Sequence, residues 1–330
     1  MNQKREYAFD YLRIVSMIMV IIVHVSNVYS RSFGVISNKS FLISLGFNTI
    51  SRISVPIFLM ISGALLLDRS FNKTKYWKRI IKYLILIVSW DIIYLVWEYL
   101  YLGITYNQLY RLLVNPYRAH LWFLYTILVL YILQPVLKWI MDHANKQTKI
   151  VLFIIWILFS ILSITNSFIA NTFTIFSYIG YFILGKHVYQ WVKEKDLKKY
   201  TGIMIITIII CCMMSIILNY LFSIKYNRFY NLFFAYRTPF IFIASVSFYV
   251  MMISNIKKEK ISPIVNLLSS SSLGVYLIHG MFLDITIQSF YYQRVNSLIG
   301  IPLFSIIILI CSVLVVWLLR KIKIIKGIIE

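Results

Sequence analysis

The chain has 330 residues, of which 60% are hydrophobic and only 13% are charged. A soluble domain of this length carries about twice that charged fraction, and apolar runs of about 20 residues recur along the whole chain. This pattern excludes a soluble enzyme and predicts an all-α membrane protein that crosses the bilayer many times. The formal net charge of +22 does not indicate a nucleic-acid partner, because the basic residues stand in short clusters between apolar runs.

Ten apolar segments are long enough to cross the membrane as helices. They cover residues 10–30, 41–67, 80–102, 120–141, 149–169, 173–192, 201–223, 237–254, 264–290 and 298–320. The weakest separation lies between the fifth and sixth segments, where only "TNSFIAN" intervenes. No long polar segment interrupts the series, so residues 1–330 are expected to form a single transmembrane domain without a soluble domain.

Lysine and arginine residues fall mostly on one side of these ten segments. With the N-terminus in the cytoplasm, the cytoplasmic segments hold 24 of the 33 Lys and Arg residues, and the outer loops hold eight. Such an excess of positive charge is typical of cytoplasmic loops. The sequence therefore predicts that both termini are cytoplasmic.

The first segment, "FDYLRIVSMIMVIIVHV" at residues 9–25, carries three polar groups that lipid penalises. Asp10 and Arg13 are three residues apart and can pair on one helical face. Arg13 and His24 are eleven residues apart, which brings them to the same side of the helix with a rise of about 16 Å. In the predicted orientation, Arg13 lies near the cytoplasmic face and His24 lies beyond the middle of the membrane.

Ionisable residues also occur in later segments. In the predicted topology Arg52, His120 and His279 lie at middle-to-outer depth, as His24 does. Glu98, in the third segment, can line a cavity inside the helix bundle or join two helices by a polar contact. Depth alone leaves open whether these groups meet, and each histidine can equally be a hydrogen-bonded packing residue. Three histidines on three helices without close spacing do not predict a metal site.

Four stretches of the sequence carry motifs in a fixed order. "DYLR" followed by "HV" places ten residues between Arg13 and His24, and the other stretches are "VPIFLMISGALLL" (55–67), "AHLWFLYTILVLYILQPVL" (119–137) and "SSSLGVYLIHGMFLD" (270–284). Together they resemble the Arg-x10-His, Ser-Gly, H-x-W-F-L and G-x-Y-L-I-H motifs of the acyltransferase-3 family of integral-membrane O-acyltransferases. The resemblance runs in order along nearly the whole chain.

Members of this family move acyl groups, commonly acetyl from cytoplasmic acetyl-CoA, onto hydroxyl groups of sugars or lipid-linked glycans at the outer face. The resemblance implies that Arg13 and His24 are essential, with His24 as the general base or acyl-transfer residue. From the spacing, Asp10 is expected to steady Arg13. Further site positions are expected at Ser62 and Gly63 near the donor, and at Arg52, Glu98, His120, Trp122, Tyr125 and His279 in the cavity.

Many members carry an R-x-x-R motif in the first cytoplasmic loop. Here the loop reads "RSFNKTKYWKRIIKY", with Arg79 and Lys82 at that spacing and Lys75 and Lys78 before them. The basic cluster Arg69–Lys82 is predicted to neutralise the phosphates of CoA. Positive-inside topology explains the same charges equally well, and the departure from R-x-x-R leaves the donor contacts open.

The predicted function is O-acetylation of a surface glycan, such as an exopolysaccharide, a capsule or a cell-wall polymer, by a multi-pass enzyme in a bacterial plasma membrane. Acetyl-CoA is the expected donor, membrane lipid the surroundings, and no metal is expected. A transporter or flippase for polysaccharide precursors stays open, although no inverted repeat is visible. A glycan polymerase would need larger outer loops than 103–119 and 224–236, and a dead scaffold would lack Arg13 or His24.

Overall fold

The computed structural model describes residues 6–68, 70–103, 118–165, 174–256, 260–289 and 292–322, and within these ranges it contains helices and no β-strand. The long helices are α1 (Tyr7–Arg31), α2 (Asn38–Ser51), α3 (Ser54–Leu67), α4 (Lys73–Trp97), α5 (Trp122–His143), α6 (Lys146–Thr165), α8 (Thr174–Glu194), α9 (Thr201–Lys225), α10 (Pro239–Asn255), α11 (Pro263–Ser289) and α12 (Ser297–Leu319). Short helical turns are η1 (Glu98–Leu102), η3 (Ala119–Leu121), η4 (Lys198–Tyr200), η5 (Leu232–Phe234) and η6 (Tyr292–Arg294).

The prediction of an all-helical membrane protein is confirmed. In the described ranges, nine segments are long and apolar enough to cross a membrane, with Asn38–Leu67 counted as one. The sixth predicted span is present as the helix α8, but it is not among the nine. Charged residues near its end, including Lys186 and Lys193, lower its hydropathy. The cytoplasmic placement of both termini stays a prediction.

The second predicted span, 41–67, is confirmed as one apolar segment, Asn38–Leu67, but within it the helix is interrupted between α2 and α3. The helix α2 ends at Ser51 and α3 begins at Ser54. Pro56 has no N–H to donate to the carbonyl of Arg52 four residues earlier, and its ring would clash with that carbonyl in a continuous helix. The Ser54 hydroxyl instead donates to the Ser51 carbonyl over 2.7 Å. The break places Arg52 between two helix ends.

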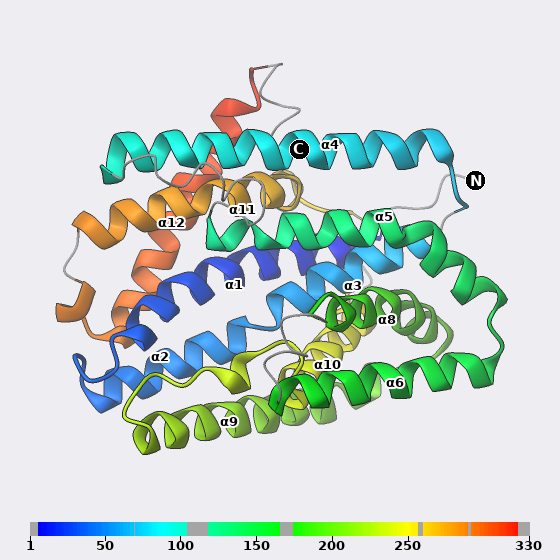
Figure 1. The fold of residues 1–330 in the computed structure, drawn as a ribbon, viewed down its shortest axis with the longest axis horizontal. Coiled ribbons are helices and arrows are strands. Elements are labelled where there is room, and N and C mark those ends of the chain that lie inside the picture. The colour runs from blue at the N-terminus through cyan, green and yellow to red at the C-terminus, as the bar shows by residue number, and fades with distance from the viewer. Residues whose placement is uncertain are drawn as a thin grey trace.

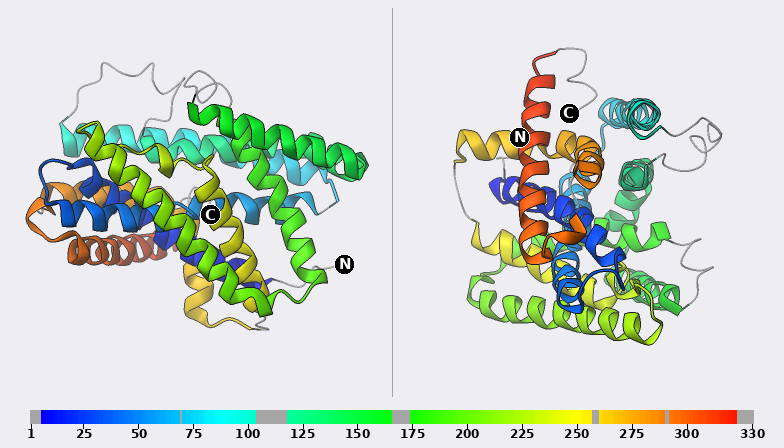
Figure 2. Two further views of the ribbon diagram at one scale, coloured as in Figure 1. Left: turned by 90° about the horizontal axis from the view of Figure 1, so that it is seen from below. Right: turned by 90° about the vertical axis from the view of Figure 1, so that its left-hand side faces the viewer.

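The bundle has a buried centre and an apolar exterior. The helix α1 lies inside, between α4 on one side and α9 on the other (Figure 1), and the end-on view in Figure 2 keeps α4 and α9 on opposite sides. On α1, Leu12 and Ile21 are at most 1% exposed. Outward side chains such as Val88 on α4, Ile206 on α9 and Ile306 on α12 are more than half exposed, as expected of a surface covered by lipid.

Two glycines let α3 and α8 approach closely. A Cβ atom on Gly63 would lie 1.7 Å from the carbonyl oxygen of Phe182, and one on Gly185 would lie 2.0 Å from that of Met60. Small residues commonly allow such backbone contact between membrane helices. Gly63 therefore packs α3 against α8, and its predicted part in donor binding stays a prediction.

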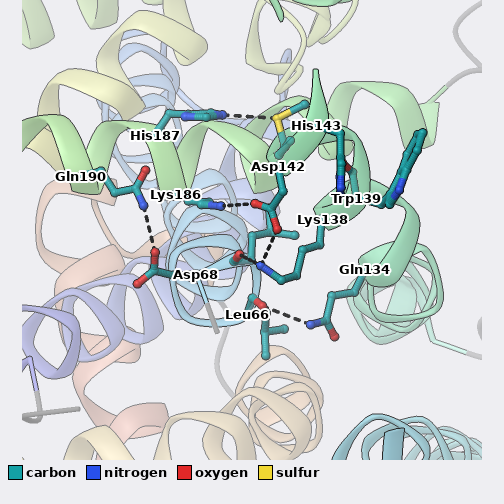
Figure 3. A network of polar contacts seen from close by, with 12 residues as sticks. Leu66, Asp68, Gln134, Lys138, Trp139, Asp142, His143, Lys186, His187 and Gln190 are labelled. Atoms are coloured by element: carbon teal, nitrogen blue, oxygen red, sulfur yellow. Dashed lines mark hydrogen bonds and ion pairs between the residues drawn. The ribbon is translucent and has the colours of Figure 1, made fainter. Parts of the chain in front are cut away.

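A polar network closes the end of α3 (Figure 3). The ammonium group of Lys138 on α5 donates to the carbonyl of Leu67 over 3.2 Å and to Asp142 over 2.8 Å. Asp142 also accepts a bond of 3.1 Å from Lys186 of α8. Gln134 donates to the carbonyl of Leu66 over 3.1 Å. The last carbonyls of a helix lack partners within it, so these bonds both cap α3 and join it to α5 and α8.

Candidate active site

The first turns of α1 hold the predicted Asp10–Arg13 pair. Arg13 Nη1 donates to Asp10 Oδ1 over 3.3 Å, and the Ser269 hydroxyl of α11 donates to the same oxygen over 2.6 Å. Asp10 is 2% exposed, whereas the side chain of Arg13 is 32% exposed. Asp10 is thus held by two helices, and the guanidinium group of Arg13 stays accessible.

A cavity of about 560 Å³ lies beside this pair. Side chains of α1, α3, α4, α5 and α11 line it, so it runs between helices that are far apart in the sequence. Its polar lining residues are Asp10, Arg13, Ser62, Tyr83, Tyr131, Ser269, Ser270, Ser272 and Tyr276. The cavity combines one accessible cation with hydroxyl groups and apolar walls, which suits a ligand with a charged end and a long, weakly polar arm.

Three histidines from distant parts of the chain meet in the interior. The ring centroids of His24 on α1 and His279 on α11 lie 5.0 Å apart, and His120 of η3 lies 5.0 Å from His279 and 6.1 Å from His24. His120 and His279 are buried, and His24 is partly exposed. The residues that shared only a predicted depth therefore form one cluster, called here the histidine cluster.

The histidine cluster has ring nitrogens available for a ligand. His279 Nδ1 lies 2.6 Å from the carbonyl of Tyr276, so this nitrogen carries the proton and Nε2 is an acceptor. In the described part of the chain, the Nε2 atoms of His279 and His120 are buried without a hydrogen-bond partner. Buried polar atoms normally have partners, and unpaired ones are frequent where substrate or water binds. No group of three or more His, Cys, Asp or Glu residues among those described is arranged to hold a metal ion.

Tyr276 joins the cavity to the histidine cluster. Its ring lines the cavity, and its centroid lies 5.9 Å from His279 and 6.1 Å from His120. Its hydroxyl group donates to the carbonyl of His120. Phe123 packs against it with centroids 5.7 Å apart. The cavity that Arg13 lines therefore also reaches Tyr276, whose ring borders two of the histidines.

Gly280 makes room for His120, a role that the sequence analysis did not predict. A Cβ atom there would lie 2.7 Å from Cε1 of His120 and 2.8 Å from the Tyr94 hydroxyl oxygen. Tyr94 donates to the carbonyl of Leu277 over 2.7 Å, and its ring centroid lies 4.9 Å from that of His120. The glycine that follows His279 thus lets a second histidine and a tyrosine pack against α11.

An ion-pair network holds the chain just before His120. Arg118 donates to Glu98 over 2.8 Å and to both carboxylate oxygens of Asp284 over 2.5 Å, and Trp97 donates to Asp284 over 3.1 Å. Burial lowers the pKa of the Arg118 guanidinium, but the two carboxylates outweigh burial and raise that pKa above its ordinary value. Glu98, predicted to line the cavity, is thus a partner of Arg118. Sequence reasoning missed Arg118, although it lies two residues before a motif histidine.

Arg52 and Trp122 lie at a group of aromatic rings outside the histidine cluster. Arg52 Nε donates to Asn48 over 2.9 Å, and the Arg52 guanidinium carbon lies 5.9 Å from the ring centroid of Tyr236. Trp122 stacks on Tyr236 at 5.9 Å and lies 5.2 Å from Tyr178. Arg52 is therefore held by Asn48 and by aromatic rings that are distinct from the rings of the histidine cluster.

Tyr125 connects two helices. Its hydroxyl group donates to the carboxylate of Asp91, which is 5% exposed in α4. The bond joins α5 to α4 next to the segment that carries His120. The structure therefore gives Tyr125 a place in the scaffold, and its predicted contact with substrate stays a prediction.

Arg79, a member of the predicted basic cluster Arg69–Lys82, contacts the wall of the cavity. Its Nη1 donates to Gln134 over 2.9 Å, and its guanidinium carbon lies 5.3 Å from the ring centroid of Tyr131, which lines the cavity. Gln134 is also one of the two residues that cap α3 (Figure 3). Arg79 therefore lies close to the cavity and is held there by two side chains.

The other basic residues of this cluster lie farther out on α4 or are not described. Lys75 and Lys78 are exposed, and Lys82 is partly buried. Arg69 lies outside the described residues. Their predicted contact with the donor phosphates stays a prediction.

Comparison with known proteins identifies the family. A family model described as an acyltransferase domain matches residues 6–321, nearly the entire chain. The chain belongs to the acyltransferase-3 family. No curated protein and no solved structure matches it. The acyltransferase-3 match extends from α1 to α12, so the resemblance of the four motifs is confirmed and the protein is a membrane acyltransferase.

Proposed function

We propose that this acyltransferase-3 protein transfers an acetyl group from cytoplasmic acetyl-CoA to a hydroxyl group of a sugar or lipid-linked glycan at the outer face of a bacterial plasma membrane. The observation that carries the proposal is the cavity beside Arg13, whose lining includes Tyr276, the ring that borders the histidine cluster. A flippase has no need for basic ring nitrogens next to such a cavity, which favours acyl transfer over transport.

The donor site in this proposal extends from the cations to the histidines. Arg13 and Arg79 supply positive charge for the phosphate groups of CoA. The cavity accommodates the pantetheine arm, and its serine and tyrosine hydroxyl groups serve the amides of that arm. Along α1 the rise from Arg13 to His24 is about 16 Å, which is about the length of the arm. The thioester then lies near His24.

His24 acts as the general base. Neutral imidazole accepts the proton of the acceptor hydroxyl group, while the hydroxyl oxygen attacks the thioester carbonyl carbon. The carbon–sulfur bond breaks, and CoA leaves as a thiolate that takes up a proton. In the two-step alternative, His24 first carries the acetyl group and then passes it to the hydroxyl group. His120 and His279 border the imidazole of His24 and orient it in either route.

Mass spectrometry of surface glycan tests this proposal. Cells with and without the protein are compared, and the proposal predicts that the glycan loses its acetyl groups while its amount stays the same. Loss of a flippase would instead lower the amount of glycan at the surface. Unchanged acetylation of every surface glycan in cells without the protein would overturn the proposal.

A further inference from the structure

Three aromatic side chains form a compact group beside the break between α2 and α3. Trp122, Tyr178 and Tyr236 come from α5, α8 and the segment before α10, and are called here the aromatic cluster. Their centroids lie 5.2 to 6.2 Å apart. Figure 1 shows the segment before α10 returning from the end of α9 toward the middle of the bundle. Trp122 and Tyr236 are partly exposed, so ring surface is available to a ligand.

Two arginines accompany the aromatic cluster. The guanidinium carbon of Arg52 lies 5.5 Å from the ring centroid of Phe234 and 5.9 Å from that of Tyr236. Arg237 follows Tyr236 directly in the chain, and its Nε atom is buried. Two positive charges therefore stand at one group of rings inside the membrane domain.

These two charges have no carboxylate partner in the described ranges. The carboxylates of Glu98 and Asp284 are both bound to Arg118. Arg237 Nε is buried and finds no hydrogen-bond acceptor among the described residues. Contacts with ring faces attract a cation but accept no full set of hydrogen bonds from it. Because unpaired charges in a membrane domain are costly, their retention indicates an anionic ligand.

The position of the two arginines relates the ligand to the acceptor side. The described residues that line the cavity beside Arg13 do not include Arg52, Arg237 or any member of the aromatic cluster. The Trp122 ring of the aromatic cluster nevertheless lies 6.1 Å from the Phe123 ring, and Phe123 packs against Tyr276, which borders the histidine cluster. A group bound at the aromatic cluster would thus lie on the side of the histidine cluster that is outside the donor cavity. In the predicted orientation, Arg52 is in the outer half of the membrane, where the acceptor arrives.

We propose that Arg52 and Arg237 bind an anionic group of the acceptor, a phosphate or a carboxylate, while the aromatic cluster packs against a sugar ring. Guanidinium groups bind phosphate and carboxylate oxygens with charge-assisted hydrogen bonds, and aromatic rings suit the apolar faces of sugars. The acceptor is therefore an acidic or phosphate-linked glycan, and a neutral one is a poor substrate. The inference rests on the proposed acetyl transfer at His24.

Fractionated acceptors test this inference. Surface glycan is taken from the cells that make this protein, and its acetyl groups are removed. Anion exchange then separates it into neutral, carboxylate-bearing and phosphate-bearing fractions. Purified protein in lipid vesicles receives each fraction with labelled acetyl-CoA, and the label on glycan is counted. Wild-type protein is expected to acetylate an anionic fraction at least about tenfold faster than the neutral one. The preferred fraction distinguishes phosphate from carboxylate.

Arginine variants assign the preference to residues. Arg52→Gln and Arg237→Gln are each expected to raise the KM for the anionic fraction about tenfold, with acetyl-CoA binding unchanged. Arg228→Gln, in the exposed part of the same loop, is the matched control and keeps the wild-type KM. Arg52→Lys and Arg237→Lys retain the charge and are expected to recover part of the affinity, which separates a lost charge from a misfolded chain.

Failure of this inference differs from failure of the proposed function. Equal acetylation of neutral and anionic fractions by wild-type protein, or an anionic preference that persists in both glutamine variants, overturns the anionic site alone. A wild-type protein that binds acetyl-CoA but labels no fraction overturns the proposed acetyl transfer and this inference with it.

Discussion

Replacing Arg118 with glutamine tests how strongly the ion-pair network holds the segment that carries His120. The change removes one positive charge from two carboxylates, Glu98 and Asp284, whose side chains are each 12% exposed. Glutamine keeps the ability to donate one hydrogen bond but cannot satisfy both acceptors. The two carboxylates, formerly joined by the arginine, then repel each other in a poorly hydrated environment.

The expected loss of stability is large for a single substitution. Removing one partner of a buried ion pair costs about 3–5 kcal/mol, because the remaining charge is left without compensation. The matched control is Lys138→Gln in the network of Figure 3, where the partner Asp142 is 38% exposed. Pairs with such exposure contribute about 0–1 kcal/mol. Arg118→Gln should thus destabilise the protein several times more than Lys138→Gln.

Thermal unfolding in detergent, followed by circular dichroism, measures the difference. We expect a clear drop in Tm for Arg118→Gln and a small drop for Lys138→Gln. Adding Asp284→Asn to Arg118→Gln should restore part of the lost Tm, because the double variant has one unpaired carboxylate fewer. Equal Tm values for Arg118→Gln and wild type would refute the reasoning, as would a double variant that is less stable than Arg118→Gln alone.

Two further predictions concern α3 and the donor site. Gly63→Ala should destabilise the protein by about 1–3 kcal/mol in thermal unfolding, because the added methyl group meets the Phe182 carbonyl at 1.7 Å. The control Gly46→Ala has open space around it and should not destabilise the protein. A Gly63→Ala protein as stable as the Gly46→Ala protein would contradict the packing argument. Arg79→Gln should raise the KM for acetyl-CoA about tenfold, because it loses a charge-assisted bond to phosphate. Lys198→Gln, at an exposed position in η4, should leave that KM unchanged, and equal KM values for the two variants would remove Arg79 from the donor site.

Much of α1 could be predicted from the sequence because its geometry is local. A spacing of three residues predicts the Asp10–Arg13 pair, and the structure has that pair at 3.3 Å. The lengths of the apolar segments predict the helices in the same way, because in lipid each segment must pair its own backbone N–H and C=O groups. A partner for Asp10 on another helix could not be predicted, because the bond from Ser269 of α11 depends on how distant helices pack together.

The meeting of the histidines could not be predicted from the sequence. Topology fixes how deep His24, His120 and His279 lie, but it fixes neither which helices are neighbours nor how each is rotated. The break before α3 had a visible signal in Pro56, but hydropathy averages over a window and passes over it. The sequence does not distinguish Arg118 from an ordinary loop charge, because its two carboxylate partners belong to other helical segments.

The central claim is that His24 is the base for acetyl transfer, and the most direct test is the rate of transfer by the His24→Ala protein. Purified protein in lipid vesicles receives labelled acetyl-CoA and deacetylated surface glycan, and the label on glycan is followed in time. The account predicts a loss of at least about 100-fold for His24→Ala, with acetyl-CoA binding and Tm preserved. His143→Ala, at an exposed position at the end of α5, is the matched control and should transfer at the wild-type rate. A folded His24→Ala protein that transfers acetyl at the wild-type rate would contradict the account.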